Sequence, residues 1–128
     1  MSWEERFQKI GDTHRKEMEE WKRRREQTQK AVEEIELRFG PLIERMAKSL
    51  GFNLKKWELQ WYWYMPAKGR YIGFKFFEGE IKIEYNNNSS FSAVPEKEEV
   101  IYISNAEVSG VSPEEKLVQV VESWVKID

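Results

Sequence analysis

The residues of this sequence with types suited to hydrolytic chemistry are few. Glu80 and Lys82 flank Ile81 in a Glu-x-Lys pattern. Such a pair could contribute to a Mg²⁺ site, where two or more carboxylates hold the metal and a lysine lies near the attacking water. The chain has no cysteine and a single histidine, His14. This composition excludes disulfides, thiolate metal sites and a cysteine nucleophile, and it argues against a histidine metal centre or a catalytic triad.

The segment Glu80-Ile81-Lys82 resembles the Glu-x-Lys half of the signature of the PD-(D/E)XK nucleases. The expected order of a helix, a three-stranded meander and a helix is also similar to the core of that family. The resemblance implies a metal-dependent nuclease with a partner acid on the preceding strand. The strand expected at residues 70–77 contains no acid, and Glu78 falls in the following turn. A degenerate nuclease-like domain is therefore the third of three hypotheses, and we expect a non-enzymatic protein without cofactor or bound metal.

The densest basic run, Lys22-Arg23-Arg24-Arg25, is the second candidate for a binding site. On a helix its members spread around most of the circumference, and Glu19, Glu20 and Glu26 offer partners three or four residues away. A solvated, salt-bridged helix is the interpretation that this pattern favours. Contact with phosphates or with an acidic partner is the alternative.

The third candidate is aromatic. Residues 57–66 read WELQWYWYMP, with apolar and polar residues in alternation. Trp57, Trp61 and Trp63 are predicted to face a core. The opposite face would carry Tyr62, Tyr64, Tyr71, Lys75 and Lys82. Three interpretations of that face remain open: a solvated surface, a surface covered by a helix or another protomer, and a recognition surface that stacks bases of single-stranded nucleic acid.

These residues must be positioned by a small α+β fold. Residues 57–86 predict an antiparallel meander, because turns at 66–69 and 78–79 independently place the same side chains of the middle strand on one face. They pair Trp61 with Phe74 and Phe74 with Ile83. Residues 86–99 predict a long mobile loop and residues 100–104 a fourth short strand. Ser112-Pro113-Glu114-Glu115 predicts the capped start of a C-terminal amphipathic helix.

A long helix is predicted over residues 2–39. Its seam is spaced by steps of three and four residues, with one extra four-residue step between His14 and Met18, and is typical of a coiled coil. Phe39-Gly40-Pro41 predicts the end of this helix and the start of a short one at 41–50. We therefore expect a helix for association at residues 1–39 and a small α+β domain at 40–128. The seam residues expected to associate are Trp3, Phe7, Ile10, His14, Met18, Trp21, Val32 and Ile35.

Composition limits the class of protein. Hydrophobic residues make up 40% of the 128 residues, enough for a core, and the net charge of −2 provides no overall attraction to nucleic acid. No apolar run approaches the length of a membrane span, and the acidic start Met-Ser-Trp-Glu-Glu lacks a signal peptide, so we expect a cytoplasmic protein. The excess of glutamate over aspartate is thermophile-like.

The leading functional hypothesis is a protein-protein interaction module, of the adaptor, assembly-factor or inhibitor kind. A helix of 38 residues would extend about 57 Å, and a domain of this size cannot cover its whole seam. We expect the partner to be a second copy, as a homodimer, or a different protein. The alternative is a nucleic-acid-binding protein that uses the tyrosine face together with Lys22–Arg25.

Overall fold

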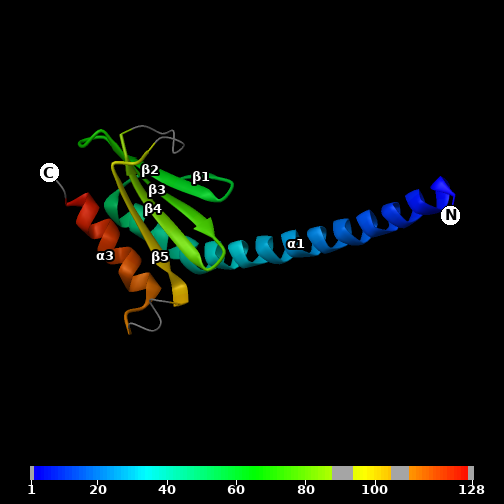
Figure 1. Cartoon of the computed structure of the whole chain (residues 1–128). Helices are drawn as coiled ribbons and strands as arrows, with labels where there is room; N and C mark the ends of the chain where they lie inside the picture. The colour runs from blue at the N-terminus through cyan, green and yellow to red at the C-terminus, as the bar shows by residue number, and fades with distance from the viewer. Residues whose placement is uncertain (1, 88–93, 105–109, 127–128) are drawn as a thin grey trace. The chain divides into compact units, whose positions relative to one another are not determined.

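A computed structural model describes residues 2–87, 94–104 and 110–126. Helix α1 (Trp3–Leu50) is followed by a five-stranded antiparallel sheet and by helix α3 (Pro113–Val125) (Figure 1). The predicted α+β class is confirmed, although the sheet has five strands rather than three to four. The strands lie in sequence order: β1 (Lys55–Trp57), β2 (Gln60–Met65), β3 (Arg70–Phe77), β4 (Glu80–Asn86) and β5 (Lys97–Tyr102).

The chain divides into two compact units, residues 1–30 and residues 31–128. The first unit is helical from Trp3 onward. The second contains the C-terminal part of α1, the sheet and α3, so its boundary lies nine residues before the division expected after residue 39. None of the helices in the described ranges carries an apolar stretch long enough to span a bilayer.

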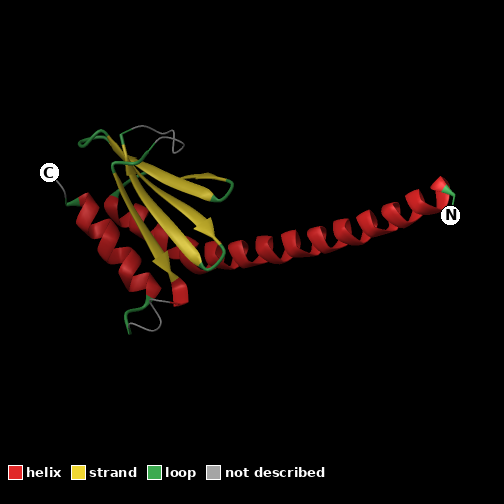
Figure 2. Cartoon of the chain, in the orientation of Figure 1, coloured by secondary structure: helices red, strands yellow, loops and turns green. Residues whose placement is uncertain are grey.

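The core of the second unit lies between one face of the sheet and the two helices (Figure 2). Strands β2, β3 and β4 contribute alternate side chains to it, as a strand period of two requires. Helix α1 contributes residues three or four apart, and α3 contributes Leu117, Val121 and Trp124. The helix residues from α1 are Val32, Ile35, Phe39, Ile43 and Ala47.

Helix α1 continues through Gly40 and Pro41, so the predicted break between two helices is wrong. Gly40 does not adopt a positive φ, whereas Gly51 does, with a φ of 78°, and α1 ends there. A proline within a helix costs about 3 kcal/mol. Burial of Phe39 and Ile43 on either side of Pro41 offsets that cost, because each buried large side chain contributes about 1.5–3 kcal/mol.

The predicted register of the meander is confirmed. Trp61 pairs with Phe74, and Phe74 pairs in turn with Ile83. Tyr64 lies opposite Tyr71, and Tyr62 lies opposite Gly73. The turn at Glu78-Gly79 has Gly79 at a φ of 68°, a conformation that glycine adopts without steric cost.

The first and last strands differ from the prediction. The alternation that starts at Trp57 is interrupted by a turn at Glu58-Leu59, where Glu58 has a φ of 52°, and Trp57 lies on the separate edge strand β1 with its side chain 70% exposed. The placement of Trp57 in the core was therefore wrong. The strand predicted at 100–104 is β5, which begins at Lys97; of the predicted loop, residues 88–93 lie outside the described residues.

The start of α3 follows the predicted capping box. The Ser112 hydroxyl accepts a hydrogen bond from the Glu115 backbone N–H at 3.1 Å, and Pro113 occupies the first turn. Glu114 then accepts two hydrogen bonds from Arg38 of α1, at 2.5 and 3.3 Å. The hydrogen bond from Arg38 lowers the pKa of Glu114, so this contact joins the two helices most strongly when the carboxylate is ionised.

Gly40 lies where α1 approaches the sheet closely. Replacement of Gly40 by alanine should therefore destabilise the protein, whereas the same replacement at Gly11 should not. A Cβ at Gly40 would lie 2.8 Å from the buried Trp61 ring, whereas a Cβ at Gly11 has no atom within 4 Å. Gly40→Ala should destabilise the second unit by about 1–2 kcal/mol in urea unfolding, since overpacking outweighs the gain in helix propensity. Gly11→Ala, the control, should raise helicity by circular dichroism without lowering stability. A Gly40→Ala variant at least as stable as the unmodified chain would contradict the close approach.

Two tryptophans of the quoted segment provide the second test. Trp61 is 5% exposed at the centre of the core, and Trp57 is largely exposed. Trp61→Ala should cost about 3–5 kcal/mol of unfolding free energy, while Trp57→Ala should cost less than about 1 kcal/mol. Equal losses from urea unfolding of the two variants would show that β1 packs differently.

Candidate functional site

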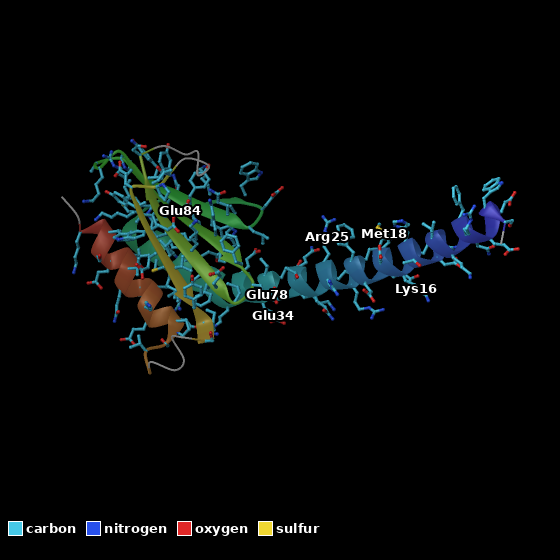
Figure 3. The ribbon with its side chains drawn as sticks, viewed as in Figure 1. Lys16, Met18, Arg25, Glu34, Glu78 and Glu84 are labelled. Carbon is cyan, nitrogen blue, oxygen red and sulfur yellow. The ribbon has the colours of Figure 1, made fainter. Side chains whose placement is uncertain are left out.

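The exposed surface of α1 in the first unit carries a stripe of large apolar side chains. They are 51–65% exposed: Trp3, Phe7, Ile10, Met18 and Trp21. Along the helix, Met18 and Arg25 lie on one side and Lys16 on the other (Figure 3). We call the set Trp3, Phe7, Ile10, His14, Met18, Trp21 and Arg25 the exposed seam. Its members other than Arg25 were predicted as seam residues, and the structure brings all seven onto one face because they recur every three or four residues.

Contacts within the exposed seam are local. Trp3 and Phe7 pack edge to face with their ring centroids 5.5 Å apart, and the Arg25 guanidinium lies 5.3 Å from the Trp21 ring centroid. His14 Nδ1 lies 3.8 Å from a carboxylate oxygen of Glu17. Beside these contacts, Trp3, Phe7 and Trp21 remain at least half exposed.

A hollow of about 390 Å³ lies on the exposed seam, lined by His14, Glu17, Met18 and Trp21. These four residues have the spacing i, i+3, i+4 and i+7. That is the spacing of the hole into which a side chain of a facing helix inserts in a coiled coil. The hollow thus has the residue spacing of a coiled-coil hole.

Val32 and Ile35 do not belong to the exposed seam. Both are buried against the sheet in the core of the second unit. The sequence pattern runs through both units without a change of period, so the pattern alone could not separate buried from exposed positions. Residues 32 and 35 thus stabilise the fold rather than offering a surface for association.

The basic run Lys22–Arg25 is exposed along its whole length. Its members face different directions around α1, because each residue of an α-helix is rotated by about 100° from the one before it. Of the four, Arg25 lies in the exposed seam beside Trp21. The run therefore does not form a single basic face.

The predicted tyrosine face lies on the side of the sheet away from the core. Tyr71 is its centre, with ring centroids 6.0 Å from Tyr62 and 4.7 Å from Tyr64. A pocket of about 400 Å³ opens beside the three rings. Its remaining lining comes from Gly51, Phe52 and Asn53, which join α1 to β1, and from Lys55 at the start of β1.

Glu84, which the sequence analysis did not single out, lies at the middle of the same face and is 2% exposed (Figure 3). One carboxylate oxygen, Oε1, lies 3.3 Å from the Lys75 amine and 3.5 Å from the Lys82 amine. Lys82 also lies 3.3 Å from Glu98. The available signal was Gly73, the cross-strand neighbour of Glu84, because a glycine leaves room for a neighbouring side chain to lie flat.

The charged side chains around Glu84 form ion pairs with one another. Partial burial acts to lower the pKa of Lys82, but the hydrogen bonds and negative charges of Glu98 and Glu84 outweigh it, and the pKa is raised. Lys82 is therefore a paired cation with a half-buried side chain. The amines of Lys75 and Lys82 contact Glu84, and both side chains are also partly exposed to solvent.

Glu80 lies on β4, and no carboxylate lies directly opposite it on the two neighbouring strands. Its neighbours across the sheet are Phe77 and Tyr102. Among the described residues there is no group of three or more His, Asp or Glu side chains arranged to hold a metal ion. The Glu-x-Lys pattern here follows the alternation of strand β4, with Ile81 in the core.

Residues 2–74 match the model of DUF6680, a family described as being of unknown function. The chain belongs to the DUF6680 family. The matched region includes all of α1, with the exposed seam, and the three tyrosines of the sheet. No curated protein and no solved structure matches the chain. The exposed seam and the three tyrosines thus lie in the part of the chain that the DUF6680 model describes, whereas Lys75, Lys82 and Glu84 follow it.

Glu84 should contribute to stability through its two lysine contacts. Glu84→Gln keeps the shape of the side chain but removes the charge that Lys75 and Lys82 approach, and we expect a loss of about 1–3 kcal/mol in urea unfolding. Glu98→Gln is the matched control. The Glu98 side chain is 41% exposed, so its loss should cost less than about 1 kcal/mol. Equal effects of the two changes would show that burial of Glu84 carries no energetic weight.

Proposed function

We propose that this member of the DUF6680 family is a non-enzymatic protein-association module that binds another polypeptide through α1. The observation that carries the proposal is the exposed seam of the first unit, where large apolar side chains stand on one helical face. Contiguous exposed apolar surface of this kind marks a binding site in soluble proteins.

The character of the exposed seam supports a helical partner. Trp and Phe give large contact areas at low cost in side-chain entropy, and Trp and Arg are common among residues that dominate binding energy. Knobs-into-holes packing needs apolar residues in alternating steps of three and four, which the exposed seam provides. The charged residues between seam positions keep the remaining circumference hydrated.

Binding of nucleic acid is the second candidate. The clustered tyrosines beside their pocket and the exposed run Lys22–Arg25 favour it, since single strands bind by base stacking and by contacts to phosphates. The pairing of Lys75 and Lys82 with Glu84 weakens it, because cations already neutralised release fewer counterions. A mobility-shift assay with single- and double-stranded nucleic acid at two salt concentrations separates the two candidates.

The proposal predicts that charge introduced into the exposed seam disperses the assembly. Phe7→Glu combined with Trp21→Glu removes two aromatic contacts and buries two carboxylates in any interface, so we expect the sedimentation mass to fall to that of the single chain, 15.4 kDa. Circular dichroism and tryptophan fluorescence should show that the sheet and α3 remain folded. The second unit has its own core, which neither residue joins.

The control changes charge equally on the opposite side of the helix. Gln8→Glu combined with Gln27→Glu adds the same two negative charges at exposed positions outside the exposed seam and should leave the assembly intact. A monomeric unmodified chain with no partner that depends on Phe7 and Trp21 would refute the association module.

A further inference from the structure

We propose that the partner of the exposed seam is a second copy of this chain, paired antiparallel about His14. This inference rests on the proposed function, association through α1, and names its partner and geometry. It follows from the spacing of the seam residues, the hollow beside His14 and the position of Arg25.

The spacing of the exposed seam reads the same in both directions. From Trp3 to Arg25 the steps are four, three, four, four, three and four residues, and His14 is the midpoint. Two antiparallel copies centred on His14 therefore bring every seam residue opposite another seam residue. The layers are Trp3 with Arg25, Phe7 with Trp21, Ile10 with Met18, and His14 with its own copy.

The extra four-residue step limits the alternatives. A single interruption shifts the phase of a heptad seam, and two helices stay matched only if their interruptions coincide. Interruptions coincide in one antiparallel register, about His14, and in the parallel in-register pair. In any other register, the extra four-residue step of one helix lies opposite a regular part of the other, and the apolar residues of the two helices no longer face each other.

Charge distinguishes the two matched arrangements. A parallel pair stacks Arg25 on Arg25, and like charges facing each other in a core layer are destabilising. In the antiparallel pair, Arg25 faces Trp3 of the second copy while it remains beside Trp21 of its own helix. A guanidinium between two indole faces gains cation–π attraction at both. Phe7 and Trp21 form aromatic layers on either side of the centre.

The hollow on the exposed seam supports the same register. Its lining residues, His14 to Trp21, are centred between Glu17 and Met18. Reflection about His14 places Ile10 of the second copy at that height, so a branched apolar side chain would enter the hollow. In the parallel pair the residue at that height is Met18 or Glu17. Two symmetric hollows would each receive one isoleucine.

Disulfide trapping tests this geometry, because the chain contains no cysteine of its own. Ile10→Cys and Met18→Cys variants are prepared separately, one with a mass tag, and oxidised alone and as a mixture. The antiparallel pair brings positions 10 and 18 together, within the short Cβ separation that a disulfide needs. We expect a several-fold higher yield of cross-linked chains in the mixture than in either variant alone. Lys16→Cys mixed with Met18→Cys is the control, because Lys16 lies on the opposite side of α1 and should not cross-link (Figure 3).

Sedimentation of the unmodified chain measures its mass in solution without any substitution. We expect a mass twice that of the single chain, which is 15.4 kDa. Efficient cross-linking of each variant alone, without the mixture, would establish the parallel pair and overturn the antiparallel one. A monomer that binds a different protein through Phe7 and Trp21 would overturn the second copy while leaving the association module intact. A monomer without such a partner would overturn both.

Discussion

The fold depends on how closely helix α1 can approach the sheet. Gly40 has no Cβ, and this allows the Trp61 ring to lie only 2.8 Å from the position that a Cβ would occupy. Phe39 and Ile43, on either side of that contact, are fully buried in the same core. Because these residues must share one helical face, the helix cannot stop and restart at Gly40-Pro41 without moving one of them away from the sheet. The close approach therefore explains why the proline is tolerated within α1.

Continuity of α1 carries its periodicity into the first unit. The three-and-four spacing that buries residues 32–47 against the sheet continues to Trp3, where the corresponding side chains are exposed. A helix stripe of this kind gains most of its stability from the surface it packs on rather than from intrinsic propensity. The second unit supplies that surface for its own segment. Under the proposed association, a partner helix supplies it for the first.

The sheet has two faces of different character. The core face is apolar at its centre and carries charged residues such as Lys56 and Glu99 toward its edges, while the other face combines the tyrosines with a buried carboxylate and its two lysines. A buried carboxylate is costly unless cations or hydrogen bonds compensate it. Lys75 and Lys82 meet that requirement at Oε1 of Glu84, whereas Oε2 is buried without a hydrogen-bond partner among the described residues.

Features that depend on residues close together in the chain could be predicted from the sequence. The register of β2, β3 and β4 followed from alternation between two turns of defined length, and the start of α3 followed from Ser112 and Pro113. Both depend on residues close together in the chain. The positions of the exposed seam, Trp3 to Arg25, were likewise readable, since a helical period assigns residues to a face without reference to the rest of the fold.

Contacts between distant residues were decided only by the tertiary structure. Gly40 has the local signature of a helix end, and its role became clear only beside Trp61, 21 positions later. Trp57 belongs to the alternating pattern, yet the turn at Glu58-Leu59 takes it out of the core. Val32 and Ile35 share the period of the exposed seam but are covered by the sheet. Periodicity determines which side chains share a face, whereas burial depends on what the rest of the chain brings against that face.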